Sequence, residues 1–351
     1  MMFSELCKVL DRLDSGPGYF VSLDLISDML NDLQEEEVSP AIRLMLNEPD
    51  PVWSQDCSPL DLRAIIDVAS EKSGLSRKDF LRLVGQTNDL PSAIEIALMK
   101  REESHRDNRV SITINEAYSL VRELSSRFEN DDSPFLDRVR ELFDALRPNE
   151  VKHLVKNLLF EGRSRSCEGV LEESISRLSS IELSEIRRKN ALVSDVALVG
   201  RVALSTDREG FSRLGLEIFR PIKPMTAVAA RSLEEVSEEH REVSYEFKPD
   251  GIRVQIHKQR DQVRFFDRKL MDISPLLPDL AQKIVDNIQE ESAVLEGEVV
   301  TKDIRGRLGP YSLLMGELRS REMKHAPAPS IHVDLELFDI LLLDGKDTVS
   351  Y

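Results

Sequence analysis

Tyr245-Glu246-Phe247-Lys248-Pro249-Asp250-Gly251-Ile252-Arg253 is the stretch of sequence that decides the fold of this chain. Apolar and polar residues alternate on both sides of its Pro-Asp-Gly turn, from 243 to 247 and from 252 to 256, which predicts two strands. A lysine at a strand end presents its amine to a cleft, and this amine can act as a nucleophile when its pKa is lowered. Gly251 is expected to let the backbone turn and a ligand approach. Taken alone, the same run also describes a surface lysine in a common turn.

The residues beyond this turn predict an α+β arrangement. A polar turn at 258–262 separates the strand at 252–256 from another strand that begins at Val263. A helix is expected near 276–288, and apolar strands are expected at 293–300 and 333–343. Neighbouring strands joined by short turns form an antiparallel meander, so the second half of the chain is predicted to contain an antiparallel sheet.

The residues before about position 215 follow helical spacing instead. Apolar stripes at 3–13 and 23–33 recur every three or four residues, and we expect a bundle-like array of about ten helices. Helix starts are predicted at the 58–61 cap, at the Thr113–Glu116 capping box and at Pro148, and helix ends at Gly74 and Gly162. Two prolines in the connecting segment, residues 219–225, interrupt regular structure. The predicted domains are therefore 1–216, all-helical, and 217–351, α+β.

Composition limits the class of protein. The chain has 351 residues with 41% hydrophobic and 32% charged residues, and it contains no apolar stretch long enough for a membrane span. The N-terminus lacks the pattern of a secretory signal, so we expect a cytoplasmic protein with no membrane partner. Its three cysteines are far apart, which argues against a disulfide framework and against a zinc site.

The net charge of −17 speaks against a nucleic-acid partner, but contacts to phosphates depend on a local basic face. Candidates for such a face are Lys152, Lys156, Arg163 and Arg165.

Four short runs resemble, in the expected order, the motifs of the covalent nucleotidyltransferases, which are the DNA ligases, RNA ligases and mRNA capping enzymes. Residues 246–253 resemble motif I, and Phe266-Asp267-Arg268 resembles the motif that follows it. Residues 295–299 (Leu-Glu-Gly-Glu-Val) resemble motif III, and residues 336–340 (Glu-Leu-Phe-Asp-Ile) resemble motif IIIa. One Lys-x-Asp-Gly run is a weak signal, whereas four ordered motifs within about a hundred residues are a strong one.

The resemblance implies a role for each motif residue. Lys248 would be the nucleophile that takes AMP from ATP, and Glu298 would lie near the ribose and a metal ion. Residues implied in nucleotide binding are Glu246, Arg253, Arg268, Glu298 and Phe338.

Three of these positions have a second interpretation. Arg268 also fits a solvated cation at a strand end, and Phe338 also fits an aromatic core residue. Glu298 lies within an apolar run, where a carboxylate is costly to bury unless it is paired or bound to metal.

The helical first half is most similar to the archaeal and eukaryotic type of ATP-dependent DNA ligase, in which such a domain binds the duplex around a nick. Residues 219–225 look like that family's approach to the adenylation domain. Residues 152–177 lie where the family carries helices and a turn that touch the DNA backbone, so Arg163 and Arg165 would bind phosphates. An exposed loop between helices is an equally good interpretation of residues 162–165.

By resemblance the chain would be an ATP-dependent DNA ligase that seals nicks in double-stranded DNA through a lysyl-AMP intermediate, in replication, repair and recombination. It would require ATP and Mg²⁺, bind nicked duplex DNA, and interact with a sliding clamp or a complementing C-terminal fragment. Motif IV, motif V and an OB-fold domain have no counterpart before Tyr351, so we expect a chain truncated within the adenylation domain, with a strand edge exposed after Leu343. The alternative is an inactive, shortened ligase homologue that only binds duplex DNA.

Overall fold

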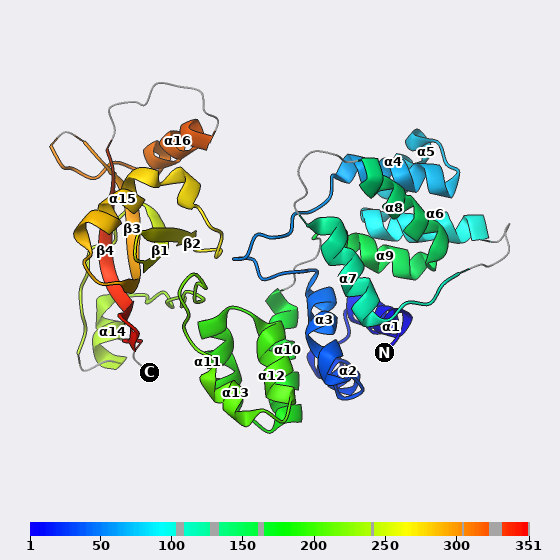
Figure 1. The fold of residues 1–351 in the computed structure, drawn as a ribbon, viewed down its shortest axis with the longest axis horizontal. Coiled ribbons are helices and arrows are strands. Elements are labelled where there is room, and N and C mark those ends of the chain that lie inside the picture. Colours follow the sequence, from blue (N-terminus) through cyan, green and yellow to red (C-terminus); the bar gives the residue numbers. More distant parts are fainter. Residues whose placement is uncertain are drawn as a thin grey trace. The chain divides into compact units, whose positions relative to one another are not determined.

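The computed structural model describes residues 1–351 except 103–108, 127–132, 161–164, 240–241, 304, 323–331 and 350–351. The chain divides into two compact units (Figure 1). The helical unit comprises residues 1–190 and 195–214, and the sheet unit comprises residues 191–194 and 215–351. The main division therefore falls between Leu214 and Gly215, two residues before the predicted boundary between 216 and 217.

The first unit is built from helices, as its apolar periodicity predicts. In the described part of this unit no strand is present beyond isolated bridges such as Met2–Thr113. The described part of this unit contains more helices than the ten expected, and the short final helix α13 is one of the additional ones. The helices are α1 (Phe3–Asp14), α2 (Tyr19–Asn31), α3 (Glu35–Leu46), α4 (Leu62–Ser73), α5 (Arg77–Thr87), α6 (Leu90–Glu102), α7 (Ile114–Ser125), α8 (Ser133–Ala145), α9 (Pro148–Leu158), α10 (Arg165–Ser179), α11 (Leu183–Val193), α12 (Val196–Leu204) and α13 (Arg208–Arg213).

Local signals fix the ends of these helices. The capping box at α7 is confirmed, because the Glu116 backbone N–H donates to Thr113 Oγ1 and the Thr113 N–H donates to the Glu116 carboxylate. Asp61 caps α4 by accepting a hydrogen bond from Arg63 N at 2.9 Å. At the other end of α4, Gly74 adopts a φ of +73°, the left-handed conformation that ends helices at low cost. The second predicted stop, Gly162, lies outside the described residues.

Helix α9 lies at the centre of the helical unit. Val151, Leu154, Val155 and Leu158 are completely buried, and α9 packs against α1, α6 and α7. A buried ion pair between Arg43 and Asp195 joins α3 to the start of α12. These four aliphatic side chains are buried on one face of α9, and burial of this kind is the reason that apolar residues at helical spacing predict helices in this unit.

The second unit is an antiparallel sheet covered on one face by helices, which confirms the predicted fold class. The strand order is β2-β1-β3-β4-β5. Helices α15 and α16 cover the apolar face of the sheet (Figure 1). Leu280 and Leu314 of these helices belong to one core cluster with Val254 and Leu295. Helix α16 is an element that the sequence pattern did not predict. The elements are α14 (Leu233–Glu239), β1 (Ile252–Gln259), β2 (Gln262–Asp267), η1 (Ser274–Leu276), α15 (Pro278–Asn287), β3 (Ser292–Lys302), α16 (Tyr311–Glu322), β4 (His332–Leu343) and β5 (Lys346–Asp347).

The prediction of a strand at 243–247, before the Lys248 turn, is wrong. Residues 242–250 form no regular element, and the alternating Tyr245 and Phe247 are exposed, the latter completely. A strand requires a neighbour for its backbone hydrogen bonds, and no described strand pairs with this segment. Alternation records only the pattern of side chains, so it cannot identify a missing partner.

Strand β4 contains two irregularities where it pairs with β3. The register passes from Gly297↔Leu337 to Glu296↔Asp339, which leaves Phe338 as the additional residue of a bulge. On the outer side of β4, pairing with β5 within the described residues involves only Leu342 and Leu343. Leu337, Phe338 and Ile340 are about half exposed on this strand.

Candidate functional site

The turn that carries Lys248 is anchored by two contacts, both made by residues that directly follow the lysine. Asp250 Oδ2 accepts a hydrogen bond of 3.0 Å from the backbone N–H of Tyr311, the first residue of α16. The backbone N–H of Gly251 donates to Glu298 Oε1 at 3.2 Å. Lys248 itself is exposed. The turn is therefore fixed to α16 and β3, whereas the amine stays accessible to a ligand.

Gly251 is needed for a reason other than the one its sequence context indicates. Its backbone does not have a positive φ, so no left-handed turn is involved. A Cβ atom at this position would lie 2.2 Å from the carbonyl oxygen of Val299 and 2.8 Å from Cγ of Glu298. Glycine thus permits the close approach of the turn to β3.

Glu298 lies close to the positive charges of the turn. Partial burial raises the pKa of this carboxyl group, while Lys248, the Gly251 N–H and Arg253 oppose the rise. In the antiparallel register, Arg253 stands directly opposite Glu298. The structure therefore brings together Lys248, Arg253 and Glu298, three residues that the motifs predicted for one site.

One face of the sheet beside this turn is polar. The Arg253 guanidinium forms an ion pair with Glu296, which lies on the neighbouring strand β3. A small hollow is lined by residues of this face, of the connecting segment and of the turn after β2. Its walls are Ile222, Pro224, Arg253, Gln255, Phe266, Asp267, Arg268, Leu270 and Glu296. Arg268 is exposed at this hollow, so it joins Arg253 at one place.

Glu246 and Phe338 are less closely tied to this arrangement. Glu246 is exposed in the irregular segment before the turn, where its carboxylate accepts a 3.4 Å hydrogen bond from Ser244 Oγ. No strand forms around Glu246, so strand geometry does not fix its side chain relative to Lys248. Phe338 is 53% exposed at the β4 bulge, which contradicts its interpretation as a core residue and leaves its ring open to a ligand.

Sequence reasoning missed three polar residues behind Arg253. Gln255, His257 and Glu296 are all buried on the polar face of the sheet. Part of their signal was available in the sequence, because Gln255 lies on the polar face of the strand predicted at 252–256 and His257 follows at the next alternate position. Buried polar groups at such positions require partners that only the folded chain can identify.

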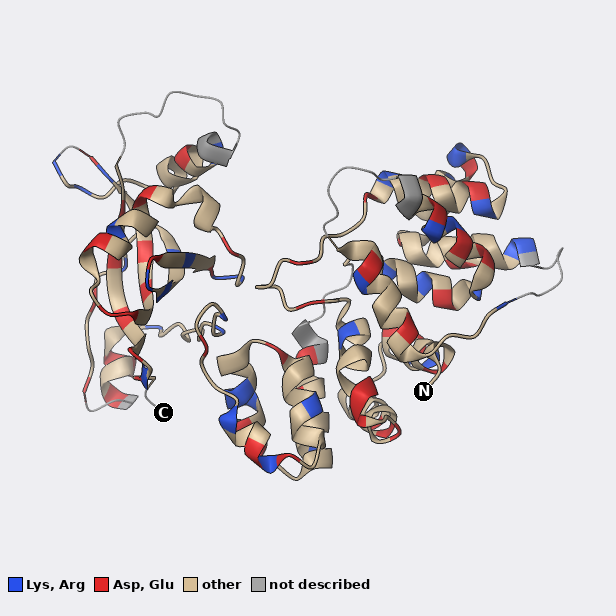
Figure 2. Ribbon diagram, in the orientation of Figure 1, with Lys and Arg blue, Asp and Glu red and all other residues tan. Residues whose placement is uncertain are grey.

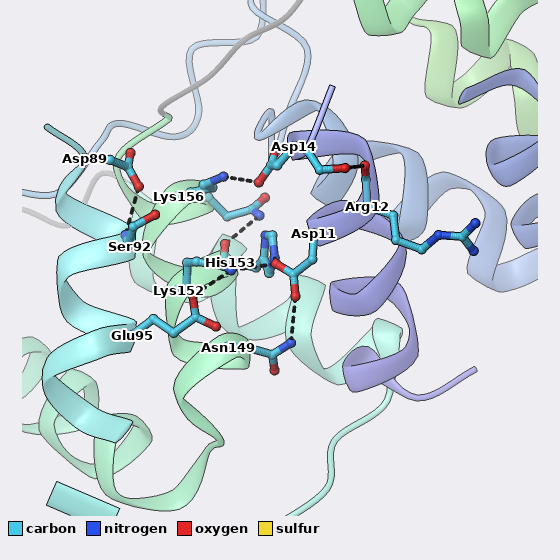
Figure 3. A network of polar contacts seen from close by, with 12 residues as sticks. Asp11, Arg12, Asp14, Asp89, Ser92, Glu95, Asn149, Lys152, His153 and Lys156 are labelled. Atoms are coloured by element: carbon cyan, nitrogen blue, oxygen red, sulfur yellow. Dashed lines mark hydrogen bonds and ion pairs between the residues drawn. The ribbon is translucent and has the colours of Figure 1, made fainter. Parts of the chain in front are cut away.

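The basic residues predicted for a DNA-binding face of the helical unit are partly occupied. Lys and Arg are interspersed with Asp and Glu over its helices (Figure 2). Lys152 contacts Asp11 at 2.5 Å and Glu95 at 2.8 Å, and Lys156 pairs with Asp14 (Figure 3). These two lysines therefore stabilise the contact of α9 with its neighbours instead of forming a free cationic face. Arg163 and the side chain of Arg165 lie outside the described residues.

The carboxylates of this network do not form a convincing metal site. In the described part of the chain, the group with suitable ligand spacing is Asp11, Asp14 and His153. Both carboxylates already contact the ammonium groups of Lys152 and Lys156, whose positive charge opposes a bound cation. His153 Nε2 also lies 2.8 Å from Asp11 Oδ1. Glu298 is not part of this group.

A helical first unit, followed by an antiparallel sheet whose first strand begins directly after the Lys248 turn, is the arrangement expected from the resemblance to the covalent nucleotidyltransferases. Two family models match its sequence: "DNA ligase N terminus" over residues 2–176 and "ATP dependent DNA ligase domain" over residues 224–351. The chain belongs to the ATP-dependent DNA ligase family.

Curated relatives agree with this assignment. A DNA ligase of Methanococcoides burtonii is 28% identical over 98% of this chain, and one of Thermococcus fumicolans is 25% identical over 99% of it. The chain spans 62% and 63% of the length of these two relatives.

The ligase domain from M. tuberculosis LigD is 27% identical over 29% of this chain and 30% of its own, with a TM-score of 0.21. No helix within the described ranges is both long enough and apolar enough to cross a bilayer.

Proposed function

We propose that this chain performs the nucleotide-accepting chemistry of an ATP-dependent DNA ligase, with Lys248 as the nucleophile. The observation that carries the proposal is the anchored turn, which holds an exposed lysine beside Glu298 and Arg253. The Lys248 amine would attack the α-phosphorus of ATP, so that an N–P bond forms, the bond to pyrophosphate breaks, and the amine loses its proton. The product would be a lysyl-AMP phosphoramidate.

The other predicted residues would hold the nucleotide during this step. Arg253 and Arg268, which line one hollow, would bind phosphate or ribose oxygens. The half-exposed ring of Phe338 is free to stack on a purine, and Glu246 would reach the adenine amino group. Mg²⁺ would neutralise phosphate charge when bound, and a single carboxylate such as Glu298 fits its preference for few protein ligands plus water and phosphates.

The helical unit would supply the duplex-binding domain, with Arg163 and Arg165 contacting phosphates. AMP would then pass to the 5′-phosphate at a nick, and the adjacent 3′-hydroxyl would displace AMP to seal the strand. A sliding clamp is a further partner in this proposal. Replication, repair and recombination in the cytoplasm are the processes in which nick sealing would be used.

The proposal is tested by incubating the chain with Mg²⁺ and ATP labelled at the α-phosphorus. Label that remains attached after denaturation and disappears in Lys248→Ala would support it. Lys346→Ala is the matched control, because this exposed lysine lies in β5 and outside the site. Absence of label, together with salt-sensitive duplex binding, would refute catalysis by this chain and support the DNA-binding alternative.

A further inference from the structure

A continuous series of hydrogen bonds links the connecting segment to Arg253. The backbone N–H of Phe219 donates to His257 Nδ1 at 2.9 Å, and the N–H of Ile222 donates to Gln255 Oε1 at 2.8 Å. Both side chains belong to β1, the strand that starts directly after the Lys248 turn. The connecting segment is therefore fixed to the strand that carries Arg253.

The proton position on His257 follows from its partners. Nδ1 accepts the Phe219 N–H, so in neutral His257 the proton is on Nε2, which donates to Gln255 Oε1 at 2.9 Å. Burial, with a contribution from the nearby Arg264, lowers the pKa of His257 to about 3. The imidazole is completely buried and stays neutral near pH 7, so this donor direction does not change.

Gln255 extends this series of hydrogen bonds to the neighbouring strand β3. Its Nε2 donates to Glu296 Oε1 at 3.2 Å, and Glu296 Oε2 accepts from the Arg253 guanidinium. Gln255 and Glu296 are each 6% exposed, whereas the Arg253 side chain is 31% exposed. The buried side chains of the series find their partners inside the protein, and its last group, the Arg253 guanidinium, is partly exposed at the hollow shared with Arg268.

The connecting segment also forms a wall of that hollow. Ile222 and Pro224 line it together with Arg253. Phe219 has a φ of +67°, a strained conformation for a residue with a Cβ, so contacts must hold it in place. Besides His257, the Arg264 guanidinium lies 5.0 Å from the centre of the Phe219 ring.

We propose that Gln255, His257 and Glu296 are positioning residues that hold Arg253 and the Ile222–Pro224 wall in one arrangement for a nucleoside triphosphate. The inference rests on the proposed function. Gln255 is suited to this place because its oxygen accepts two N–H groups while its amide donates to a carboxylate. A glutamate there would have no donor and would face the charge of Glu296.

The first test needs no nucleotide. Gln255→Met keeps the approximate side-chain size but removes all three hydrogen bonds. Amide exchange at Ile222 and the rate at which phenylglyoxal modifies Arg253, both located by mass spectrometry, should rise about tenfold or more. Gln262→Met is the control, because Gln262 is an exposed glutamine of the adjacent strand β2, and it should change neither rate. Unchanged Arg253 reactivity in Gln255→Met overturns the proposal.

A second variant separates positioning from general destabilisation. In Glu296→Gln the new side chain can still accept from Gln255 but lacks the charge that holds Arg253. Arg253 reactivity should increase, whereas exchange at Phe219 and Ile222 should stay at the wild-type rate. If both amides lose protection as well, the series serves only to hold the fold together, and the positioning role is rejected.

The second test uses labelled ATP. In both variants the ATP concentration that gives the half-maximal rate of lysine labelling should rise about tenfold, a larger change than that in the maximal labelling rate, since Arg253 would contact the nucleotide in the ground state as well. An unchanged half-saturating ATP concentration in both variants contradicts the inference. Absence of labelling in the wild-type chain refutes the proposed function instead, and the reactivity of Arg253 still decides whether the series positions it.

Discussion

Replacement of Gly251 by alanine tests whether the Lys248 turn depends on its close approach to β3. The new Cβ would lie 2.2 Å from the Val299 carbonyl oxygen, about 1.2 Å inside the 3.4 Å at which ordinary contacts begin. The obstructing atom belongs to the backbone of the central strand, so the start of β1 must move away. We expect loss of the hydrogen bond from Gly251 N to Glu298 and a decrease of about 2–3 kcal/mol in the stability of the sheet unit.

Gly316→Ala provides the matched control within the same unit. Gly316 lies inside α16, and a Cβ at its position would have no neighbouring atom within 4 Å, so alanine should stabilise the helix by about 0.5–1 kcal/mol. The two substitutions add the same atom and should change stability in opposite directions. Their difference therefore isolates the close contact at Gly251 from the general effect of removing a glycine.

Hydrogen exchange at increasing urea concentration, measured on peptides from β1 and β3, reports the stability of the sheet unit. Trp53, the one tryptophan of the chain, lies in the helical unit, and its fluorescence transition should stay unchanged in both variants. Lysine labelling by ATP should also fall by about a hundredfold in Gly251→Ala, because an ångström of displacement has such a cost in a positioned reaction. Wild-type protection of β1 and β3 in Gly251→Ala would refute the argument.

Three further predictions concern the helical unit. Partial burial raises the pKa of Asp11, but hydrogen bonds from His153 and its neighbours outweigh this and hold the pKa well below its usual range. Asp11→Asn should therefore lower the stability of the helical unit at pH 7 by about 1 kcal/mol, allowing for solvent screening. The difference from wild type, followed by Trp53 fluorescence, should shrink below about pH 4. A constant difference down to pH 2 would contradict the contacts assigned to Asp11. Burial and a neighbouring carboxylate raise the pKa of Cys57 to about 11, so its alkylation in the folded protein should be slow at pH 8 and accelerate toward pH 11. Rapid alkylation at pH 8 would contradict a raised pKa of this thiol. Thr113→Ala removes the cap of α7 and should cost about 1 kcal/mol in urea denaturation, whereas Thr113→Ser should restore most of it.

The features that the sequence predicted correctly depend on nearby residues. The capping box of Thr113 and Glu116 involves groups three positions apart, and the apolar stripe predicted at 3–13 lies within the 12 residues of α1, where Phe3, Leu6 and Leu10 are buried. The paired strands β1 and β2 are joined by a short polar turn, so alternation and turn chemistry together fixed their arrangement. Such signals are complete within a short window of sequence.

The features that the sequence did not predict depend on partners far along the chain. Lys152 is neutralised by Asp11, which is 141 positions away, so its contribution to a basic face could not be judged from its neighbours. Glu296 pairs with Arg253 only because β1 and β3 are adjacent in the sheet. Tyr245 and Phe247 show the converse case, in which an alternating pattern was present but no described strand pairs with it.

The hydrogen bond between Asp250 and the first amide of α16 also makes that amide a built-in reporter. A ligand that displaces Asp250 would change the length of this bond, and the Tyr311 amide resonance is sensitive to that length. Tyr311 is 44% exposed, so its ring can carry a fluorine label without entering the core. Occupation of the turn could then be followed in real time by magnetic resonance, without a radioactive substrate and without any product being formed.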